Sequence, residues 1–174
     1  PDFYGRVARI GKNHGAKVII DTSGEALNRA LREGGYLMKP NYREFRDLVG
    51  LDMKEESQME AEAVKMVKSG RCEILVISLG AAGALLVSKE VVECIRPPTV
   101  PILSKVGAGD SMVAGTVLSL ARGRTPRDAV LFGIAAGTAA VMTPGTELCR
   151  KEDTERLYEK MAAVRLQEPE VARP

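Results

Sequence analysis

Residues 74–80 read ILVISLG, a continuous apolar run that closes on a serine, a leucine and a glycine. A run of this length, rich in β-branched side chains and bounded by a turn residue, is typical of a buried strand. Two shorter runs of the same character lie upstream, KVIID at 17–21 and YLMKP at 36–40. Helical patterns separate and flank the runs, over 5–14, 25–33, 42–49 and 57–69. Strands that alternate with helices predict an α/β fold, with a mainly parallel sheet and helices on its faces.

The pattern changes after the strongest strand. ALLVS at 84–88 and VVECI at 91–95 predict a β-hairpin with Lys89 and Glu90 at its turn. Three helices follow, at about 111–122, 126–142 and 151–164, and a polar tail occupies 167–174. There is no internal repeat or linker, so one domain over residues 1–166 is the simplest prediction.

The chain has 174 residues, 45% of them hydrophobic and 28% charged, which is enough for one domain with a core. Its net charge is +2, from 25 basic and 23 acidic residues. This lacks the excess of positive charge that is typical of proteins that bind nucleic acid or an anionic membrane. No apolar run is long enough to span a bilayer, and the sequence opens without a secretory leader. Because the first residue is Pro1, we expect the natural start to lie upstream.

The three cysteines, Cys72, Cys94 and Cys149, are far apart and form no CxxC pair. This spacing argues against a zinc site or a disulfide framework and favours a reducing, cytoplasmic location. The one histidine, His14, has no neighbour in sequence with which to build a metal site or a catalytic triad. We therefore expect His14 to be a solvated residue near a helix end.

Residues 104–120 read SKVGAGDSMVAGTVLSL and place three small residues, Gly107, Ala108 and Gly109, before Asp110 and an apolar helix. The free amides of a helix N-terminus carry partial positive charge, and small side chains let an anion approach them closely. A carboxylate would repel that anion, but it suits a base that takes a proton from an attacking hydroxyl. The two features together indicate phosphoryl transfer to an alcohol. The alternative is that Asp110 only caps the helix.

A second polar cluster, KPNYRE at 39–44, follows a predicted strand, at the edge where open α/β sheets bind ligands. Asn41 and Glu44 lie three residues apart on one helical face, and an amide oxygen with a carboxylate suits magnesium, often through water. The alternative is an N-cap at Asn41 with Glu44 as a surface acid. Asp21 and Ser23 end the preceding strand and are expected at the same edge.

Two common nucleotide signatures are absent from the sequence. There is no GxxxxGK[ST] phosphate loop, and no GxGxxG follows a strand. SLGAAG at 78–83 does follow a strand. Its composition alone leaves a nucleotide-binding turn and a simple tight turn into the hairpin as open alternatives.

Five blocks taken together resemble the PfkB family of ribokinase-like carbohydrate kinases. They are IDTSGEAL at 20–27, KPNYRE at 39–44, SLGAAGALLV at 78–87, VGAGDSMVAG at 106–115 and FGIAAGTAAVMTPGTELC at 132–149. Within the family the likeness is greatest to the minor bacterial 6-phosphofructokinases. The resemblance implies a three-layer α/β/α fold and phosphoryl transfer from ATP to a sugar hydroxyl, that of fructose 6-phosphate, to give fructose 1,6-bisphosphate.

The resemblance also implies a role for each matching position. Asp110 matches the family's catalytic base, and Gly107, Ala108 and Gly109 match its anion hole. The positions that match the nucleotide site are Ser78, Gly80, Gly83, Ile134, Gly137 and Thr138.

The implied cofactors are ATP, Mg²⁺ and, as in some relatives, K⁺. Asn41 and Glu44 match an NxxE motif that organises magnesium and phosphate, and Lys39 matches a lysine near the nucleotide phosphates. The positions that match the potassium site are Ser104, Val106, Ala140, Thr143, Gly145 and Glu147. Near relatives often have asparagine at the place of Thr143 and arginine at the place of Glu147. These changes are harmless if backbone carbonyls bind the ion.

The sequence departs from the family at its front. Family members carry an N-terminal half, with the first strands, a glycine-pair sugar motif and a β-sheet lid, which this sequence lacks. We therefore expect a C-terminal, nucleotide-binding part whose exposed edge or apolar face favours a homo-oligomer or a partner segment. Two alternatives stay open. One is an inactive fragment or nucleotide-binding module, and the other is a kinase of tagatose 6-phosphate, fructose 1-phosphate or a nucleoside.

Overall fold

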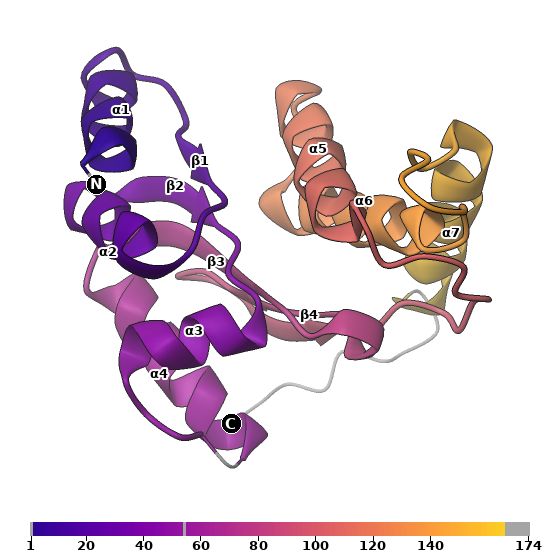
Figure 1. The fold of residues 1–174 in the computed structure, drawn as a ribbon, viewed down its shortest axis with the longest axis horizontal. Coiled ribbons are helices and arrows are strands. Elements are labelled where there is room, and N and C mark those ends of the chain that lie inside the picture. Colours follow the sequence, from indigo (N-terminus) through magenta and orange to yellow (C-terminus); the bar gives the residue numbers. More distant parts are fainter. Residues whose placement is uncertain (1, 54, 166–174) are drawn as a thin grey trace. The chain divides into compact units, whose positions relative to one another are not determined.

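The computed structural model describes residues 2–53 and 55–165 and contains the alternating helices and strands that the sequence predicts (Figure 1). They form two compact units, residues 1–96 and 97–174. The tail predicted at 167–174 lies outside the described residues. Among the helices that are described, none combines the length and the apolar character needed to cross a bilayer.

The first unit contains a five-stranded sheet with the strand order β1-β2-β3-β4-β5. The strands are β1 (Ile19–Ile20), β2 (Gly35–Met38), β3 (Cys72–Ser78), β4 (Ala84–Val87) and β5 (Val92–Ile95). β1, β2 and β3 pair in parallel, β4 pairs antiparallel with β3, and β5 pairs antiparallel with β4. All strands except β4 therefore run in one direction, which confirms the mainly parallel sheet and the hairpin.

Four helices of the first unit share one core with the sheet. They are α1 (Phe3–Asn13), α2 (Gly24–Glu33), α3 (Tyr42–Val49) and α4 (Glu56–Lys68). Each contributes buried apolar residues that cluster with Leu75 and Ile77 of β3. The alternate positions of the strands, Ile74 and Val76 among them, are also buried. The sheet is thus apolar on both faces, as in folds whose sheet is covered on both sides.

The second unit consists of α5 (Ala108–Ala121), α6 (Pro126–Ala140) and α7 (Lys151–Arg165). α5 and α7 both pack against α6, which is buried along most of its length. Most predicted boundaries differ from the observed ones by one or two residues, and two of the differences have a clear structural cause. The strand predicted at 17–21 is reduced to Ile19–Ile20, because only these residues pair with β2 at the edge of the sheet. The helix predicted at 111 begins at Ala108, because a positive φ confines the turn to Gly107.

Candidate functional site

The carboxyl ends of β1, β2 and β3 gather polar side chains, as the sequence predicts. Asp21 follows β1, Lys39 follows β2, and Ser78 ends β3. Asn41 forms a parallel bridge with Ser78, whose amide donates to the Pro40 carbonyl at 3.0 Å. The chain after β2 therefore runs alongside the end of β3 before α3 begins. This edge is where an open α/β sheet binds its ligands.

Asn41 and Glu44 form a capping box at the start of α3. The Glu44 amide donates to Asn41 Oδ1 at 2.9 Å, and the Asn41 amide donates to Glu44 Oε2 at 2.8 Å. The N-cap alternative is thus confirmed for Asn41. The same bonds leave the second carboxylate oxygen of Glu44 and the side-chain nitrogen Nδ2 of Asn41 outside the box. A carboxylate oxygen fits Mg²⁺ or its water, whereas an amide N–H fits a phosphate oxygen.

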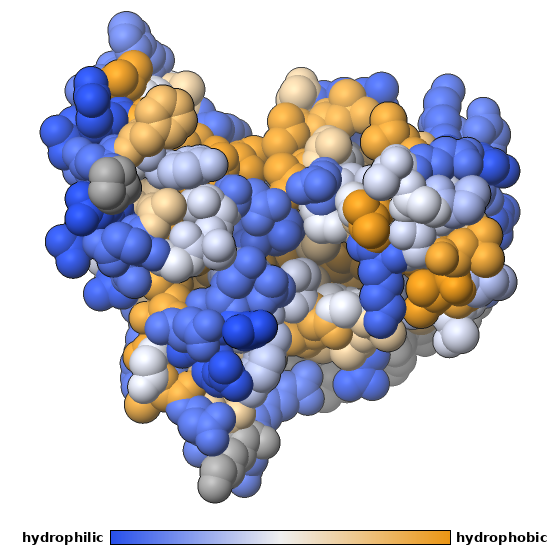
Figure 2. Space-filling view, viewed as in Figure 1, coloured by the Kyte–Doolittle hydropathy of each residue, from blue (hydrophilic) through white to orange (hydrophobic). Residues whose placement is uncertain are grey.

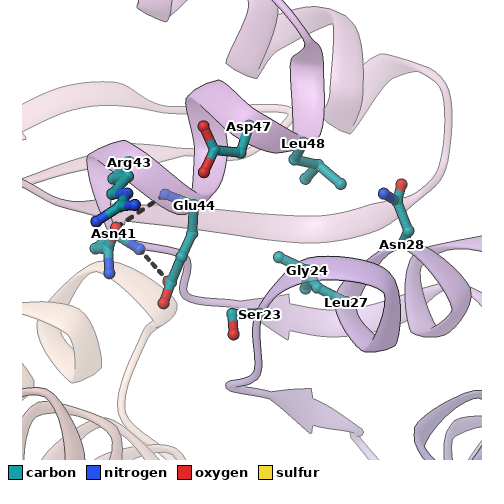
Figure 3. Close-up of a pocket in the computed structure, with 9 residues that line it drawn as sticks. All are labelled: Ser23, Gly24, Leu27, Asn28, Asn41, Arg43, Glu44, Asp47 and Leu48. Atoms are coloured by element: carbon teal, nitrogen blue, oxygen red, sulfur yellow. Dashed lines mark hydrogen bonds between the residues drawn. The ribbon is translucent and has the colours of Figure 1, made fainter. Parts of the chain in front are cut away.

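A pocket of about 420 Å³ lies beside this capping box, between the start of α2 and α3 (Figure 3). Glu44 extends into it from α3, and Ser23 borders it at the start of α2. The lining residues are Ser23, Gly24, Leu27, Asn28, Asn41, Arg43, Glu44, Asp47 and Leu48. Among residues 2–53 and 55–165, no group of three or more His, Cys, Asp or Glu side chains could hold a metal ion.

The turn after β3 is tight, and its small residues, Gly80–Ala82, are exposed. Gly80 has φ +61°, Gly83 has φ +92°, and a single 3₁₀ turn joins them. The Leu79 amide donates to the Gly83 carbonyl at 2.8 Å, which closes the turn into the hairpin. Both glycines are required by these φ values alone. The prediction of a tight turn into the hairpin is therefore confirmed. A nucleotide-binding role for Ser78, Gly80 and Gly83 stays a prediction.

The GAGD segment opens α5 in the second unit. Gly107 is the N-cap with φ +77°, and the first helical hydrogen bond runs from the Ser111 amide to the Gly107 carbonyl at 2.8 Å. The amides of Ala108, Gly109 and Asp110 precede that bond, and the anion-hole role of Gly107, Ala108 and Gly109 stays a prediction. Asp110 lies in the first turn, not at the cap. Its exposed carboxylate makes no hydrogen bond or ion pair with any residue that the structure describes.

The aspartate at the corresponding position of α6, Asp128, is hydrogen-bonded to its N-cap residue. Asp128 is also the third residue after its N-cap, Thr125. The Thr125 hydroxyl lies 2.9 Å from Asp128 Oδ2 and accepts from the Asp128 amide at 3.2 Å. Asp128 is thus engaged in capping, whereas Asp110 is not. The alternative of Asp110 as the helix cap is wrong, because a glycine without a side chain holds that position.

Three predicted nucleotide positions lie on α6 and are mostly buried. Ile134 is in the core, and the Thr138 hydroxyl donates to the Ile134 carbonyl at 2.7 Å. A Cβ on Gly137 would lie 2.9 Å from the Ala108 carbonyl oxygen, so this glycine lets α6 approach the first turn of α5. Packing thus explains Gly137 without a ligand, and the nucleotide roles of these three residues stay predictions.

Most of the residues predicted for potassium meet at the end of α6. The Thr143 hydroxyl lies 2.8 Å from the Ala140 carbonyl and 2.7 Å from the Glu147 carbonyl. The Ser104 amide donates to the Val141 carbonyl, and the Val106 amide donates to Ser104 Oγ. Gly145 lies in the turn that follows, with φ +59°. Carbonyls at a helix C-terminus suit a cation.

The Glu147 side chain forms an ion pair with Arg150 and does not contact the carbonyls at the end of α6. It accepts from Arg150 at 2.9 Å, and this hydrogen bond raises the pKa of the Arg150 guanidinium. Only the backbone carbonyl of Glu147 is therefore directed toward Thr143.

Several structurally important residues lie within the motif blocks but were given no role by the sequence analysis. Gly115 and Gly133 bring α5 and α6 together: a Cβ on Gly133 would lie 2.1 Å from Thr116 Oγ1. Their signal was the four-residue spacing of small residues, Gly133 and Gly137 on α6. Asp21 was expected at the sheet edge, but its contact with Lys39, 3.3 Å from Oδ1 to Nζ, depends on strand register. His14 is exposed directly after α1.

Comparison with known proteins places these features in one family. The ATP-dependent 6-phosphofructokinase isozyme 2 of Mycobacterium tuberculosis is 38% identical over 161 residues, which cover 92% of this chain and 47% of that protein. The 1-phosphofructokinase of Borreliella burgdorferi is 34% identical over 157 residues, 90% of this chain and 50% of that protein. The chain thus spans about half the length of the curated relatives it matches.

Solved structures agree with the sequence matches. The crystal structure of Escherichia coli phosphofructokinase-2 in complex with potassium superposes with a TM-score of 0.89 at 38% identity, over 92% of this chain and 52% of that one. Two ribokinases, 23% and 22% identical, share the fold. These likenesses confirm the predicted ribokinase-like α/β class. The sequence model of the pfkB family of carbohydrate kinases matches residues 1–153. We conclude that the chain belongs to this family.

Proposed function

We propose that the protein acts in ATP-dependent phosphorylation of a sugar phosphate, with fructose 6-phosphate as acceptor and fructose 1,6-bisphosphate as product. Family membership and the names of the relatives support the reaction class. Escherichia coli phosphofructokinase-2 has been solved in complex with fructose-6-phosphate, which supports the acceptor.

One observation carries the proposal: among the described residues, none forms a hydrogen bond or ion pair with the carboxylate of Asp110, which lies in the first turn of α5 beside amides that precede the first helical hydrogen bond. In the reaction, Asp110 takes the proton of the acceptor hydroxyl. The hydroxyl oxygen then bonds to the γ-phosphorus, the bond from that phosphorus to the β,γ-bridging oxygen breaks, and ADP leaves. The amides of Ala108, Gly109 and Asp110 stabilise charge on the transferred group.

Residues of the first unit bind the nucleotide in this proposal. Lys39 and the side-chain nitrogen Nδ2 of Asn41 contact phosphate oxygens, and the second carboxylate oxygen of Glu44 holds Mg²⁺, in part through water. When bound, Mg²⁺ neutralises phosphate charge and aligns the γ-phosphoryl group. Ser78, Gly80 and Gly83 offer backbone for the nucleotide to approach.

The family resemblance assigns nucleotide and cation roles to residues of the second unit as well. Ile134, Gly137 and Thr138 flank the adenine by the family resemblance. Carbonyls of the cluster around Thr143 bind K⁺ in this proposal, supported by their convergence at the end of α6. The remaining positions of that cluster are Ser104, Val106, Ala140, Gly145 and Glu147.

The half-length match favours a second candidate function. A chain that spans about half of its relatives could be a nucleotide-binding module that does not turn over by itself. Fructose 1-phosphate is an alternative acceptor, because one relative is named 1-phosphofructokinase. Tagatose 6-phosphate is a further alternative from the sequence analysis. We also infer a homo-oligomer in the cytoplasm; Escherichia coli phosphofructokinase-2 has been solved in a tetrameric form.

Phosphoryl transfer by the full chain tests the proposal. ADP release is followed with MgATP and each of the three sugar phosphates, and MgATP binding is measured in parallel by calorimetry. We expect Asp110→Asn to abolish transfer and to retain binding. Asp128→Asn is the matched control, because it removes the acid at the same helical position of α6. Binding without transfer in the unaltered chain would support the module, and normal transfer by Asp110→Asn would refute the base.

A further inference from the structure

β1 and β2 end side by side, and a charged residue follows each. Ile20 pairs with Met38, and the Lys39 amide donates to the Ile20 carbonyl at 3.2 Å, so the parallel alignment continues beyond the strands. It brings Asp21 and Lys39 together, with 3.3 Å between Asp21 Oδ1 and Lys39 Nζ. The backbone register, rather than mobile surface side chains, therefore sets this ion pair.

The two partners differ in exposure. The side chain of Lys39 is 8% exposed and that of Asp21 is 29% exposed. By contrast, Arg29 and Glu25 form an ion pair on α2 with side chains that are 38% and 61% exposed. An ammonium that is almost excluded from water needs an opposite charge at contact distance. Asp21 supplies this charge and still reaches solvent.

We propose that Asp21 is a positioning residue for the nucleotide: it holds the ammonium of Lys39 at the carboxyl edge of the sheet, where that ammonium meets the phosphates of ATP. The inference rests on the proposed function and gives a role to a residue to which the family resemblance assigned none. Lys39 precedes the capping box by two residues, and the chain between them is fixed against β3 by the bond from Ser78 to Pro40. Both ends of the Lys39 side chain are thus held.

A carboxylate near the phosphates also repels them, so two effects oppose each other. The repulsion acts through a side chain that reaches solvent, and salt screens it over about 10 Å at 0.1 M ionic strength. Loss of the carboxylate leaves a buried charge without its partner, which is the larger effect. Removal of Asp21 is therefore expected to weaken the binding of phosphates, not to strengthen it.

Calorimetric titration of the full chain with MgATP and with AMP tests this role. We expect Asp21→Asn to weaken MgATP binding roughly tenfold and to leave AMP binding unchanged, since Lys39 acts on the distal phosphates. Lys39→Met should have the same effect, and the double variant should bind MgATP no more weakly than Lys39→Met alone. Asp21→Glu, which keeps the carboxylate, should recover most of the affinity. Glu25→Gln removes an exposed ion-pair partner and is the matched control.

The outcomes separate the two proposals. Failure of the unaltered chain and of Glu25→Gln to bind MgATP would refute the nucleotide site and, with it, the role of Asp21. Normal binding by the unaltered chain with an equal loss of MgATP and AMP in Asp21→Asn would show a structural role only. Unchanged MgATP binding in Asp21→Asn would also overturn the inference. If Asp21→Asn alone fails to fold, the double variant decides, because it carries neither charge.

Discussion

At the residue scale, Asn41 caps α3 and, in the proposed function, also contacts phosphate, and substitution can separate the two roles. Asn41→Ala removes the cap of α3 and should lower the free energy of unfolding by about 1 kcal/mol. It should also lower the affinity for MgATP, because it removes the proposed phosphate contact. Asn41→Asp keeps an oxygen that caps equally well but replaces the amide N–H with a negative charge. We expect this variant to retain stability and to lose MgATP affinity, as measured by urea unfolding and calorimetry.

Thr125→Ala provides the control for this experiment. It removes the corresponding cap of α6, where the Asp128 amide donates to the Thr125 hydroxyl. Its stability should fall by a similar amount while MgATP affinity is retained. Equal MgATP affinity of Asn41→Asp and the unaltered chain would contradict a phosphate contact through the Asn41 amide.

Cys72 gives a prediction on pH dependence. Its side chain is 2% exposed, and burial raises the pKa of its thiol to about 12. The native thiol therefore stays protonated at pH 8, and we expect a thiol reagent to modify Cys94 and Cys149, which are half-buried, well before Cys72. Rapid modification of Cys72 in the native chain would refute the burial.

The sign of the stability effect follows from the same shift. Above the pKa of the unfolded thiol, the unfolded chain loses this proton and the native chain does not, so stability falls as pH rises toward about 12. This one group should contribute about 1.4 kcal/mol per pH unit in that range. The contribution is the difference in slope between the unaltered chain and Cys72→Ala in urea unfolding, since other groups titrate alike in both.

At the scale of elements, the contact between α5 and α6 depends on glycine. A Cβ on Gly133 would lie 2.1 Å from Thr116 Oγ1 and 2.6 Å from the Met112 carbonyl, and the second atom belongs to backbone that cannot rotate away. Gly133→Ala should therefore destabilise the second unit by about 2–3 kcal/mol, although alanine favours a helix. Gly11→Ala is the control, because the nearest atom there, 2.7 Å away, is the end of the Val18 side chain. Thermal unfolding of both variants tests the contrast.

The elements themselves could largely be predicted from local sequence. α3 was expected at 42–49 and is found at Tyr42–Val49, because Asn41 and Gly50 mark its ends chemically. The start of α5 was missed by three residues, since small residues favour a loop and only the φ of Gly107 shows where the helix begins. The ion pair between Asp21 and Lys39 depends on the register of two distant strands, which no local pattern determines.

At the scale of the whole molecule, α1 leaves an apolar stripe uncovered. Phe3, Val7 and Ile10 recur at helical spacing and are 70%, 46% and 57% exposed, while Gly5 and Ala8 on the same helix are buried. Hydrophobic surface is visible over this helix (Figure 2). A helix normally turns such a stripe toward a core or a partner. The sequence analysis expected an exposed edge or apolar face, but it did not identify which residues form it.

This stripe leads us to expect concentration-dependent self-association of the chain in sedimentation experiments. Val7→Lys and Ile10→Lys together should shift the equilibrium toward monomer without lowering the melting temperature, because both side chains are already exposed. Leu148→Lys is the matched control: Leu148 is 78% exposed but belongs to the second unit and not to the stripe. If Leu148→Lys dissociates the assembly and the α1 variant does not, association uses another surface. A monomer at every concentration would mean that exposed apolar area on α1 is too small to hold two copies together.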